Sequence, residues 1–349
     1  MRAALIGAGR IARHHLACIR ALPGVELAAV CDLSPVAAEV TAERSGARRW
    51  FTDHRAMLAE VAPDVVHVTA PPHVHYALAS DALAAGSHVI VEKPAAADLD
   101  DVRRLLELAA DSGRHLVENH NYLFNAPVLA LRDLLRAGQL GDVVHVEVAM
   151  CLDILVEGSP FADRNLPHPA LGLPGGAIAD FLPHLASLAH VFVASHHTAH
   201  AVWRRHGAGP LVADEFRGLV DAEHGTAMLS FSANGRPDLF SVRVSGTRGR
   251  ATAGLFEPRL VVERLRDVPR PLLPTINGLS EGRTAVGAAV GSLARKFRGG
   301  PGGYEGLWLL IERTYAAIAE GADPPVSPAD IEAVHHLIAD LTINAPEAA

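Results

Sequence analysis

The residues best suited to chemistry in this sequence follow a short apolar run. Val89-Ile90-Val91 has the character of a buried strand, and Glu92-Lys93-Pro94 come directly after it. In an open parallel α/β sheet, ligands bind in the crevice beyond the carboxyl ends of the strands, so Lys93 is expected at that edge. A lysine ammonium there suits reactions of hydroxyl and carbonyl groups, because it stabilises the negative charge that develops on oxygen.

A glycine-rich turn, Gly7-Ala8-Gly9-Arg10-Ile11-Ala12, lies near the start of the chain. It follows the apolar run Ala3–Ile6 and precedes a helical pattern, which is the context that a dinucleotide-binding turn requires. The glycines permit a tight turn and a close approach to pyrophosphate, and the helix expected to begin near Arg10 directs its positive end at the phosphates. We therefore predict a bound nicotinamide dinucleotide. Its contacts in this turn are expected from Gly7, Gly9, Arg10 and Ile11.

An acid ends the next apolar run and bears on which dinucleotide binds. Asp32 stands twenty residues after Ala12, where a carboxylate accepts hydrogen bonds from ribose hydroxyls and repels a 2′-phosphate. No arginine follows immediately, since Leu33, Ser34 and Pro35 come next. The alternative role for Asp32, an N-cap of the helix at Pro35, suits Ser34 better. NAD is therefore favoured over NADP.

These residues need a scaffold, and the first 118 residues alternate between β-rich runs and helical patterns, as stacked βαβ units do. We predict a Rossmann domain with a doubly wound parallel sheet over residues 1–120. Its strands are expected at Ala3–Ile6, Leu27–Cys31, Val65–Thr69, His88–Val91 and His115–Val117.

Beyond residue 120 the pattern changes to clustered strands with helices set apart, which indicates an α+β domain with a large, mostly antiparallel open sheet. We predict that residues 121–349 form this domain and serve substrate binding and oligomerisation. Its helices are expected near Val128–Arg136, Phe181–Val193, Leu307–Glu320 and Asp330–Thr342. Its strands are expected at Val143–Met150, Ala199–Arg205, Phe216–Ala222, Thr226–Ser232, Leu239–Ser245 and Leu260–Arg264. Two Gly-rich stretches, Gly158–Gly176 and Pro269–Gly303, are expected to be a functional loop and an insertion.

Composition narrows the class of protein. With 31 basic and 39 acidic residues the formal charge is −8, which argues against a nucleic-acid partner. The three cysteines, Cys18, Cys31 and Cys151, suggest neither a disulfide framework nor a zinc site. No apolar run approaches the roughly 18 residues of a membrane span, and the start of the chain lacks signal-peptide character. We expect a cytoplasmic protein without a membrane partner.

Twenty histidines raise the question of a metal. Two groups stand close in sequence, His73 with His75 and His196-His197 with His200, and histidines two apart share one face of a strand. Neither group has an acidic or cysteine ligand at a useful spacing nearby. Solvated or core histidines explain both groups, so we predict no metal centre.

Motifs in both halves together resemble a known family. Beside the first turn and Glu92-Lys93-Pro94 they include Ala70-Pro71-Pro72-His73-Val74-His75, Gly175-Gly176-Ala177 and Asp180-Phe181-Leu182-Pro183-His184. This combination resembles the glucose–fructose oxidoreductase, inositol dehydrogenase and rhizopine-catabolism (Gfo/Idh/MocA) family, with motifs in order from Arg2 to about Leu341. The resemblance implies oxidation or reduction of sugars, inositols and related polyols with bound NAD(H) or NADP(H), and a homodimer or homotetramer formed through the C-terminal sheet.

The resemblance also implies roles for single residues. Lys93 would contact the reacting hydroxyl and the nicotinamide ribose, His184 would shuttle the proton, and Asp180 would hold the substrate or orient the site. Histidine suits proton transfer because it titrates near neutral pH. The alternatives are a helix N-cap at Asp180, a buried His184 and a solvated Glu92–Lys93 pair. Further cofactor contacts are expected from Ala70, Pro71, His75 and Glu92.

One departure from the family affects the substrate. Where family members often carry an arginine, this chain has Leu123, which cannot pair with an anionic or heavily hydroxylated substrate. Asn121 and Tyr122 remain as candidate polar contacts, although Tyr122 equally suits the core. The function predicted is an oxidoreductase acting on a secondary alcohol or ketone of a sugar, polyol or nucleotide-linked sugar. The alternatives are glycoside cleavage by transient oxidation and a non-catalytic sensor that keeps the cofactor fold.

Overall fold

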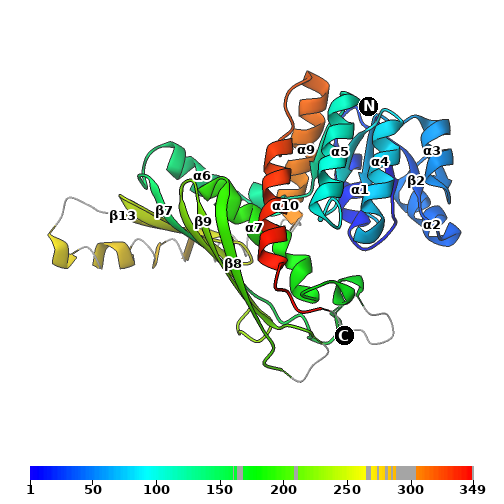
Figure 1. The fold of residues 1–349 in the computed structure, drawn as a ribbon. Coiled ribbons are helices and arrows are strands. Elements are labelled where there is room, and N and C mark those ends of the chain that lie inside the picture. The colour runs from blue at the N-terminus through cyan, green and yellow to red at the C-terminus, as the bar shows by residue number, and fades with distance from the viewer. Residues whose placement is uncertain are drawn as a thin grey trace. The chain divides into compact units, whose positions relative to one another are not determined.

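The computed structural model describes residues 1–159, 161–162, 168–207, 211–264, 269–272, 275–279, 282–283, 286–287 and 304–347 (Figure 1). The chain forms two compact units. Unit 1 comprises Met1–Asn121 and Leu307–His335, and unit 2 comprises Tyr122–Gly306 and His336–Ala349. A C-terminal segment thus joins unit 1, although the sequence assigns it to the second half. Most of the expected insertion Pro269–Gly303, and part of the expected loop Gly158–Gly176, lie outside the described residues.

Unit 1 contains a six-stranded parallel sheet in the order β3-β2-β1-β4-β5-β6, which confirms the doubly wound fold. The chain order reverses at β1, whose neighbours are β2 and β4. The carboxyl ends of β1 and β4 therefore border the topological switch point, where ligands of such sheets bind. The strands are β1 (Arg2–Ile6), β2 (Glu26–Cys31), β3 (Arg49–Phe51), β4 (Val65–Val68), β5 (His88–Val91) and β6 (Leu116–Glu118).

The helices of unit 1 lie between these strands in sequence. They are α1 (Ala12–Ala21), α2 (Pro35–Ser45), α3 (His54–Val61), α4 (His75–Ala84) and α5 (Leu99–Asp111). At the end of the chain, unit 1 also includes α9 (Glu305–Glu320) from Leu307 on and α10 (Pro328–Thr342) up to His335, while the rest of α10 belongs to unit 2. Local signals set their ends. Ser34 caps α2 through a side chain that accepts from the Ala37 amide, and Asp53 caps α3 in the same way through Arg55. In α9, Leu310 and Ile311 are fully buried, so the helix packs as part of the core.

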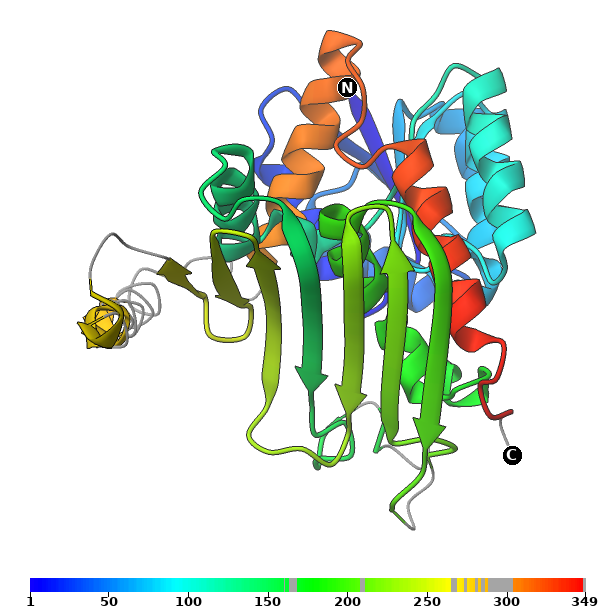
Figure 2. The same ribbon diagram turned by 60° about the vertical axis from the view of Figure 1, so that its left-hand side comes forward.

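Unit 2 is built on a seven-stranded sheet in the order β13-β12-β11-β7-β10-β9-β8 (Figure 2). Strands β7 and β10 pair in parallel and all other neighbours pair antiparallel, as the sequence predicts for a mostly antiparallel sheet. The strands are β7 (Val143–Cys151), β8 (His196–Arg204), β9 (Glu215–Ala222), β10 (Gly225–Ser232), β11 (Leu239–Gly246), β12 (Gly249–Gly254) and β13 (Arg259–Arg264).

One face of this sheet is covered and the other is exposed. Phe216, Phe231 and Phe240 are fully buried on the covered face, against which α7 (Ala177–Val193) packs. Outward-facing residues alternate with them, as the pleat requires. Leu219 and Met228 lie directly opposite each other on β9 and β10, and both are exposed.

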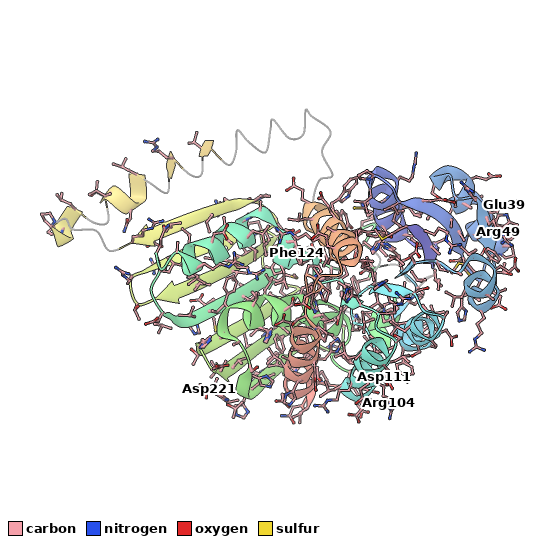
Figure 3. All side chains as sticks on the ribbon, turned by 90° about the horizontal axis from the view of Figure 1, so that it is seen from above. Glu39, Arg49, Arg104, Asp111, Phe124 and Asp221 are labelled. Atoms are coloured by element: carbon pink, nitrogen blue, oxygen red, sulfur yellow. The ribbon has the colours of Figure 1, made fainter. Side chains whose placement is uncertain are left out.

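Side chains sort by polarity in both units. Figure 3 labels Glu39, Arg104 and Asp111 at the surface of unit 1, where all three are exposed, and Phe124 of unit 2, which is buried. Phe124 lies in a short 3-10 helix (Asn121–Phe124) that precedes α6 (Ala126–Arg136). Among the described residues, no helix has both the length and the apolar character that a membrane span needs.

Candidate functional site

The first glycine of the cofactor turn is required by close contacts within the protein. Gly7 has φ of 97°, and a Cβ at this position would lie 2.5 Å from the amide nitrogen of Ala70. The Gly7 carbonyl accepts a 2.6 Å hydrogen bond from the Thr69 hydroxyl, which holds the two loops together. A side chain at residue 7 would therefore push apart the loops that follow β1 and β4.

Gly9 stands in a different environment. A Cβ there would meet no protein atom closer than the Thr69 carbonyl oxygen, 3.9 Å away. The protein itself does not need a glycine at this position, so the open space in front of it suits the close approach of a pyrophosphate. The open space at Gly9 is therefore a feature of this structure that fits a bound dinucleotide.

Asp32 lies beside this turn, as expected. One carboxylate oxygen accepts from the Ala8 amide at 2.8 Å and the other accepts from the Ser34 amide at 2.9 Å. The side chain is partly exposed, and each oxygen keeps a lone pair for a further donor. Asp32 thus joins the loops after β1 and β2 and can still accept a hydrogen bond from a ribose hydroxyl.

The first helix begins slightly later than the sequence suggests. Its first residue is Ala12 and its N-cap is Ile11, while Arg10 is exposed in the preceding turn. A pocket of roughly 230 Å³ opens beside the turn, and Arg13, Arg20 and Arg44 line it together with Ala8 and Gly9. This volume is below the roughly 300–1,000 Å³ of ligand sites, so the pocket alone does not hold a whole dinucleotide.

Glu92, which precedes Lys93, heads a buried chain of hydrogen bonds. Its carboxylate lies 2.9 Å from His15 Nε2, the Nδ1 atoms of His15 and His67 lie 2.9 Å apart, and His67 Nε2 lies 2.9 Å from the Tyr315 hydroxyl. Both histidines are fully buried and Tyr315 is 3% exposed. Asn119 donates a further hydrogen bond to the Glu92 carboxylate.

The protons along this chain can be assigned from the partners. A carboxylate only accepts, so His15 carries its proton on Nε2 and accepts on Nδ1. His67 then donates from Nδ1 and accepts on Nε2 from Tyr315. The ring of His67 is neutral in this arrangement. Burial lowers the pKa of His67 well below its ordinary value, which agrees with a neutral ring.

The ionisation of Glu92 fits the same arrangement. Burial acts to raise the pKa of this carboxyl, but the hydrogen bonds from His15 and Asn119 and the charge of Lys93 together lower it. Glu92 is therefore a carboxylate. The alternative of a solvated Glu92–Lys93 pair is wrong for Glu92, which is 9% exposed.

The sequence did not lead us to His15, His67 or Tyr315. One signal was available, because His67 is the single polar residue in the buried strand Val65-Val66-His67-Val68. Tyr315 carries no such signal, since it reaches β4 from α9 at the other end of the chain. Only the folded structure brings these groups together.

His75 ties two loops at the same edge of the sheet. Its Nε2 lies 2.7 Å from the Ala70 carbonyl and its Nδ1 lies 2.7 Å from the Pro94 carbonyl, and the residue is fully buried. Both nitrogens are engaged within the protein, so His75 acts on the site by holding the loop that contains Lys93. The expected contacts of Ala70, Pro71 and Glu92 with the cofactor stay predictions.

In unit 2, helix α7 carries two of the expected site residues. It begins at Ala177 after an N-cap at Gly176, four residues before the predicted start, so the N-cap role considered for Asp180 is wrong. Asp180 and His184 stand four apart and share one face of the helix. His184 is partly exposed, and its ring packs edge-on against Tyr122 with centroids 4.8 Å apart.

Tyr122 also contacts Phe240 edge-on, with ring centroids 4.7 Å apart. Burial, and then the charge of Tyr304, raise the pKa of Tyr122 to about 12, so its hydroxyl stays protonated. The ring contacts agree with the core role considered for Tyr122, and its contact with the substrate stays a prediction. Leu123 is 8% exposed and fills a core position, and Asn121 is also 8% exposed.

The site residues are divided between the two units. The cofactor turn, Asp32 and Lys93 belong to unit 1, whereas Asp180 and His184 belong to unit 2. The structure brings together the members within each unit. The joint action of Lys93 and His184 stays a prediction.

The structure adds an acidic partner to His196. The sequence shows no acid near it, but Asp340 lies 2.8 Å from its Nε2 in the structure. The two residues are distant in sequence and meet only through the fold of unit 2.

Comparison with known families agrees with both halves of this description. Residues 1–120 match the model of an oxidoreductase family with an NAD-binding Rossmann fold, GFO/IDH/MocA, and residues 128–252 match the C-terminal domain of the same family. The chain belongs to the Gfo/Idh/MocA oxidoreductase family. The resemblance stated from the motifs is confirmed.

Curated relatives match part of the chain. D-glucoside 3-dehydrogenase of Escherichia coli K12 is 35% identical over 44% of this chain and 43% of its own length. The dTDP-3,4-didehydro-2,6-dideoxy-alpha-D-glucose 3-reductase of Streptomyces violaceoruber is 31% identical over 56% of this chain and 55% of its own. The matched segments thus span about half the length of these relatives.

A solved structure matches nearly the whole chain. Levoglucosan dehydrogenase, in complex with NADH and levoglucosan, has a TM-score of 0.79 and 19% identity, and the match covers 98% of this chain and 96% of that one. At this identity the likeness shows the fold alone.

The two glycines of the turn lead to opposite expectations for alanine variants. Gly7→Ala should lower the free energy of unfolding by more than about 2 kcal/mol, because of its positive φ and the contact with Ala70. Gly9→Ala should change it by less than about 1 kcal/mol but weaken NAD binding. Urea unfolding and calorimetric NAD titration measure both quantities. Full stability of Gly7→Ala, or unchanged affinity in Gly9→Ala, would contradict this interpretation.

Burial of neutral His67 leads to a pH dependence of stability. Its pKa is lower in the folded than in the unfolded chain, so below about pH 6.5 the unfolded chain binds the extra proton and the free energy of unfolding falls. The slope from this one group reaches at most about 1.4 kcal/mol per pH unit. Urea unfolding from pH 7.5 to about pH 4.5 should show a smaller slope in His67→Gln.

The matched control is His73→Gln, which replaces an exposed histidine of the same unit. Its stability should follow the same pH dependence as the unaltered protein. If His67→Gln instead gives a curve parallel to that of the unaltered protein, His67 is not the group that takes up the proton.

Proposed function

We propose that the protein is an NAD-dependent oxidoreductase that transfers hydride between nicotinamide and a secondary alcohol or ketone of a sugar, polyol or nucleotide-linked sugar. The observation that carries the proposal is the position of Lys93 directly after β5, in the loop that His75 ties to the end of β4. The end of β4 borders the switch point of the sheet. Bound NAD would supply the hydride acceptor or donor.

The choice of lysine at residue 93 supports a chemical role. The sequence has only two lysines among its 31 basic residues. Apart from Lys93 and Lys296, all of these basic residues are arginines. An ammonium is a compact charge that can approach a developing alkoxide oxygen closely, whereas the broad guanidinium spreads its charge. Lys93 is therefore proposed to stabilise the alkoxide.

His184 is proposed to move the proton that the reacting hydroxyl loses or gains. Histidine is suited to both directions of transfer near neutral pH. The Tyr122 ring against its edge limits the orientations of the imidazole. Asp180, one turn earlier on α7, is proposed to hold a substrate hydroxyl or to orient the site.

The substrate class rests on what similar proteins are named for. The relatives described above are named for a D-glucoside and for a dTDP-linked deoxysugar. Leu123, at a position where family members often carry an arginine, supports a substrate without an anionic group there. The preference for NAD over NADP is supported by Asp32, a carboxylate that accepts from the Ala8 amide of the turn and would repel a 2′-phosphate. The three free cysteines support a cytoplasmic location.

Assembly through the sheet of unit 2 belongs to the same proposal. Val202, Leu219 and Met228 are 56%, 59% and 38% exposed on adjacent strands, an apolar group that water does not favour. We propose that this face joins two copies of the chain as a homodimer, or within a homotetramer.

The central prediction concerns Lys93. Lys93→Ala should lower kcat with a sugar, polyol or nucleotide-sugar substrate by at least about 10²-fold while NAD still binds, because the alkoxide loses its cation. The near-ultraviolet absorbance of NADH measures turnover, and calorimetric titration measures NAD binding. Unchanged kcat with retained NAD binding would remove the role given to Lys93.

A second variant tests the proton carrier. His184→Asn should lower kcat by roughly 10²–10⁴-fold, and His190→Asn on the same helix is the matched control that should keep full activity. The same assays separate the alternatives. Product formation without net NADH would indicate glycoside cleavage by transient oxidation. NAD and ligand binding without any turnover would indicate a sensor.

The sheet surface has its own test. Leu219→Asp places a charge in the centre of the apolar group and should shift the molar mass measured by light scattering towards that of one chain. Asp221→Asn, an exposed outward residue of the same strand, is the control and should leave the mass unchanged. A monomeric unaltered protein would remove the proposed assembly without affecting the redox proposal.

A further inference from the structure

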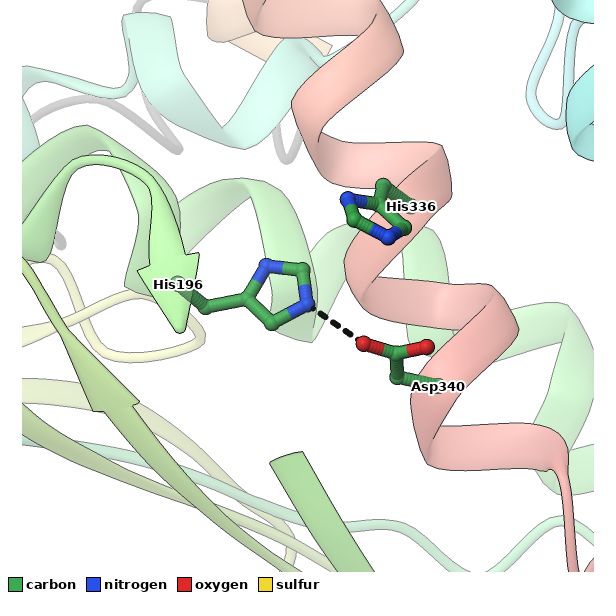
Figure 4. Close-up of side chains that lie close together, drawn as sticks. All are labelled: His196, His336 and Asp340. Atoms are coloured by element: carbon green, nitrogen blue, oxygen red, sulfur yellow. Dashed lines mark hydrogen bonds and ion pairs between the residues drawn. The ribbon is translucent and has the colours of Figure 1, made fainter. Parts of the chain in front are cut away.

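Three side chains that could bind a metal meet in unit 2, apart from the residues assigned to the redox site. His196 is the first residue of β8, the strand at one edge of the sheet. His336 and Asp340 stand four apart on α10, one helical turn from each other. Figure 4 shows both α10 side chains extending from the same side of the helix towards His196.

The distances between the three groups are short. His196 Nε2 lies 2.8 Å from one carboxylate oxygen of Asp340. The rings of His196 and His336 have centroids 4.8 Å apart. One ligand atom from each of the three residues lies within 4.8 Å of the other two. Two imidazole nitrogens and one carboxylate oxygen therefore converge on one point.

This geometry is close to that of an occupied zinc site. Zinc takes nitrogen and oxygen ligands at about 2.0–2.2 Å, so a tetrahedral ion holds its ligand atoms roughly 3.3–3.5 Å apart. The most widely separated ligand atoms need to close by at most about 1.5 Å, whereas the His196 nitrogen and the Asp340 oxygen, 2.8 Å apart, need to separate by roughly 0.6 Å. The fourth position would be taken by water.

A simple ion pair explains less of the arrangement. Asp340 and His196 would satisfy each other, but the pair gives no reason for a second imidazole beside the first. The three side chains also differ in exposure. The His196 side chain is 4% exposed, whereas that of Asp340 is 31% exposed and His336 is open to solvent. One ligand is thus held in place by the fold, and the other two leave a path for an ion from solvent.

The neighbouring histidines in the sequence do not share this arrangement. His197 and His200 are exposed on the outer side of β8, and the strand has an irregularity between His196 and Thr198. The group of three histidines that the sequence places together is therefore divided. Only His196 faces α10, and α10 supplies the acid that the sequence lacked nearby.

We propose that His196, His336 and Asp340 bind one zinc ion, or a similar transition-metal ion such as cobalt or nickel, which ties α10 to the edge strand β8. Two imidazole ligands favour these ions over magnesium and calcium, which take oxygen ligands. The three protein ligands of the ion would join two elements that have no covalent link near this point, while water keeps the fourth position open.

The experiment uses untagged full-length protein dialysed against a chelator and then titrated calorimetrically with zinc. The unaltered chain should bind one zinc ion, and zinc should raise its Tm. His336→Ala, which replaces an exposed residue, should fold normally by circular dichroism, lose zinc affinity by more than about 100-fold and show no zinc-dependent rise in Tm. His200→Ala is the matched control and should bind zinc as the unaltered chain does.

Several outcomes would overturn the site. Unchanged affinity in His336→Ala, loss of binding in His200→Ala, or magnesium binding as tightly as zinc would each remove it. Absence of stoichiometric zinc binding in the unaltered chain would show that His196 and Asp340 form an ion pair only. None of these readouts depends on redox activity, so failure of the metal site and failure of the proposed oxidoreductase function can be told apart.

Discussion

The buried hydrogen-bond chain from Glu92 to Tyr315 is the interaction on which the organisation of unit 1 depends. It connects the loop after β5 to α1, to β4 and to α9 through four side chains with almost no exposure to water. An unpaired polar group in such a place costs roughly 1–3 kcal/mol, so each member requires the next. These hydrogen bonds therefore hold in place the loop that carries Lys93.

The other loops at this edge are fixed in the same manner, by side chains that bond to neighbouring backbone. Asp32 holds the turn at Ala8, Thr69 holds Gly7, and His75 joins Ala70 to Pro94. Loops on a sheet edge are ordinarily the least rigid parts of such a fold. Here their mutual bonds set the site's shape before any ligand arrives, which lowers the cost of ordering on binding.

In unit 2, helix α7 and the sheet each contribute both to the core and to surfaces with a proposed function. The buried face of α7 packs against β7 and β10, and the same helix presents Asp180 and His184 one turn apart. The sheet buries aromatic residues on one face and leaves apolar residues on the other. Its edge strand β8 is joined to α10 by the contact between His196 and Asp340.

Local patterns in the sequence were sufficient for the class of fold, the cofactor turn and most strands, because periodicity, glycine and caps act over a few residues. They missed β3, whose three residues are largely exposed, and β12, which is bounded by glycines. They led to Lys93, Asp32, His184 and Asp180 as candidate site residues, by residue type and order. Tertiary structure alone decided which polar groups meet: His15 with His67, Tyr315 with β4, and His196 with Asp340. These contacts join residues far apart in sequence, and no local period encodes them, because each depends on how whole elements pack.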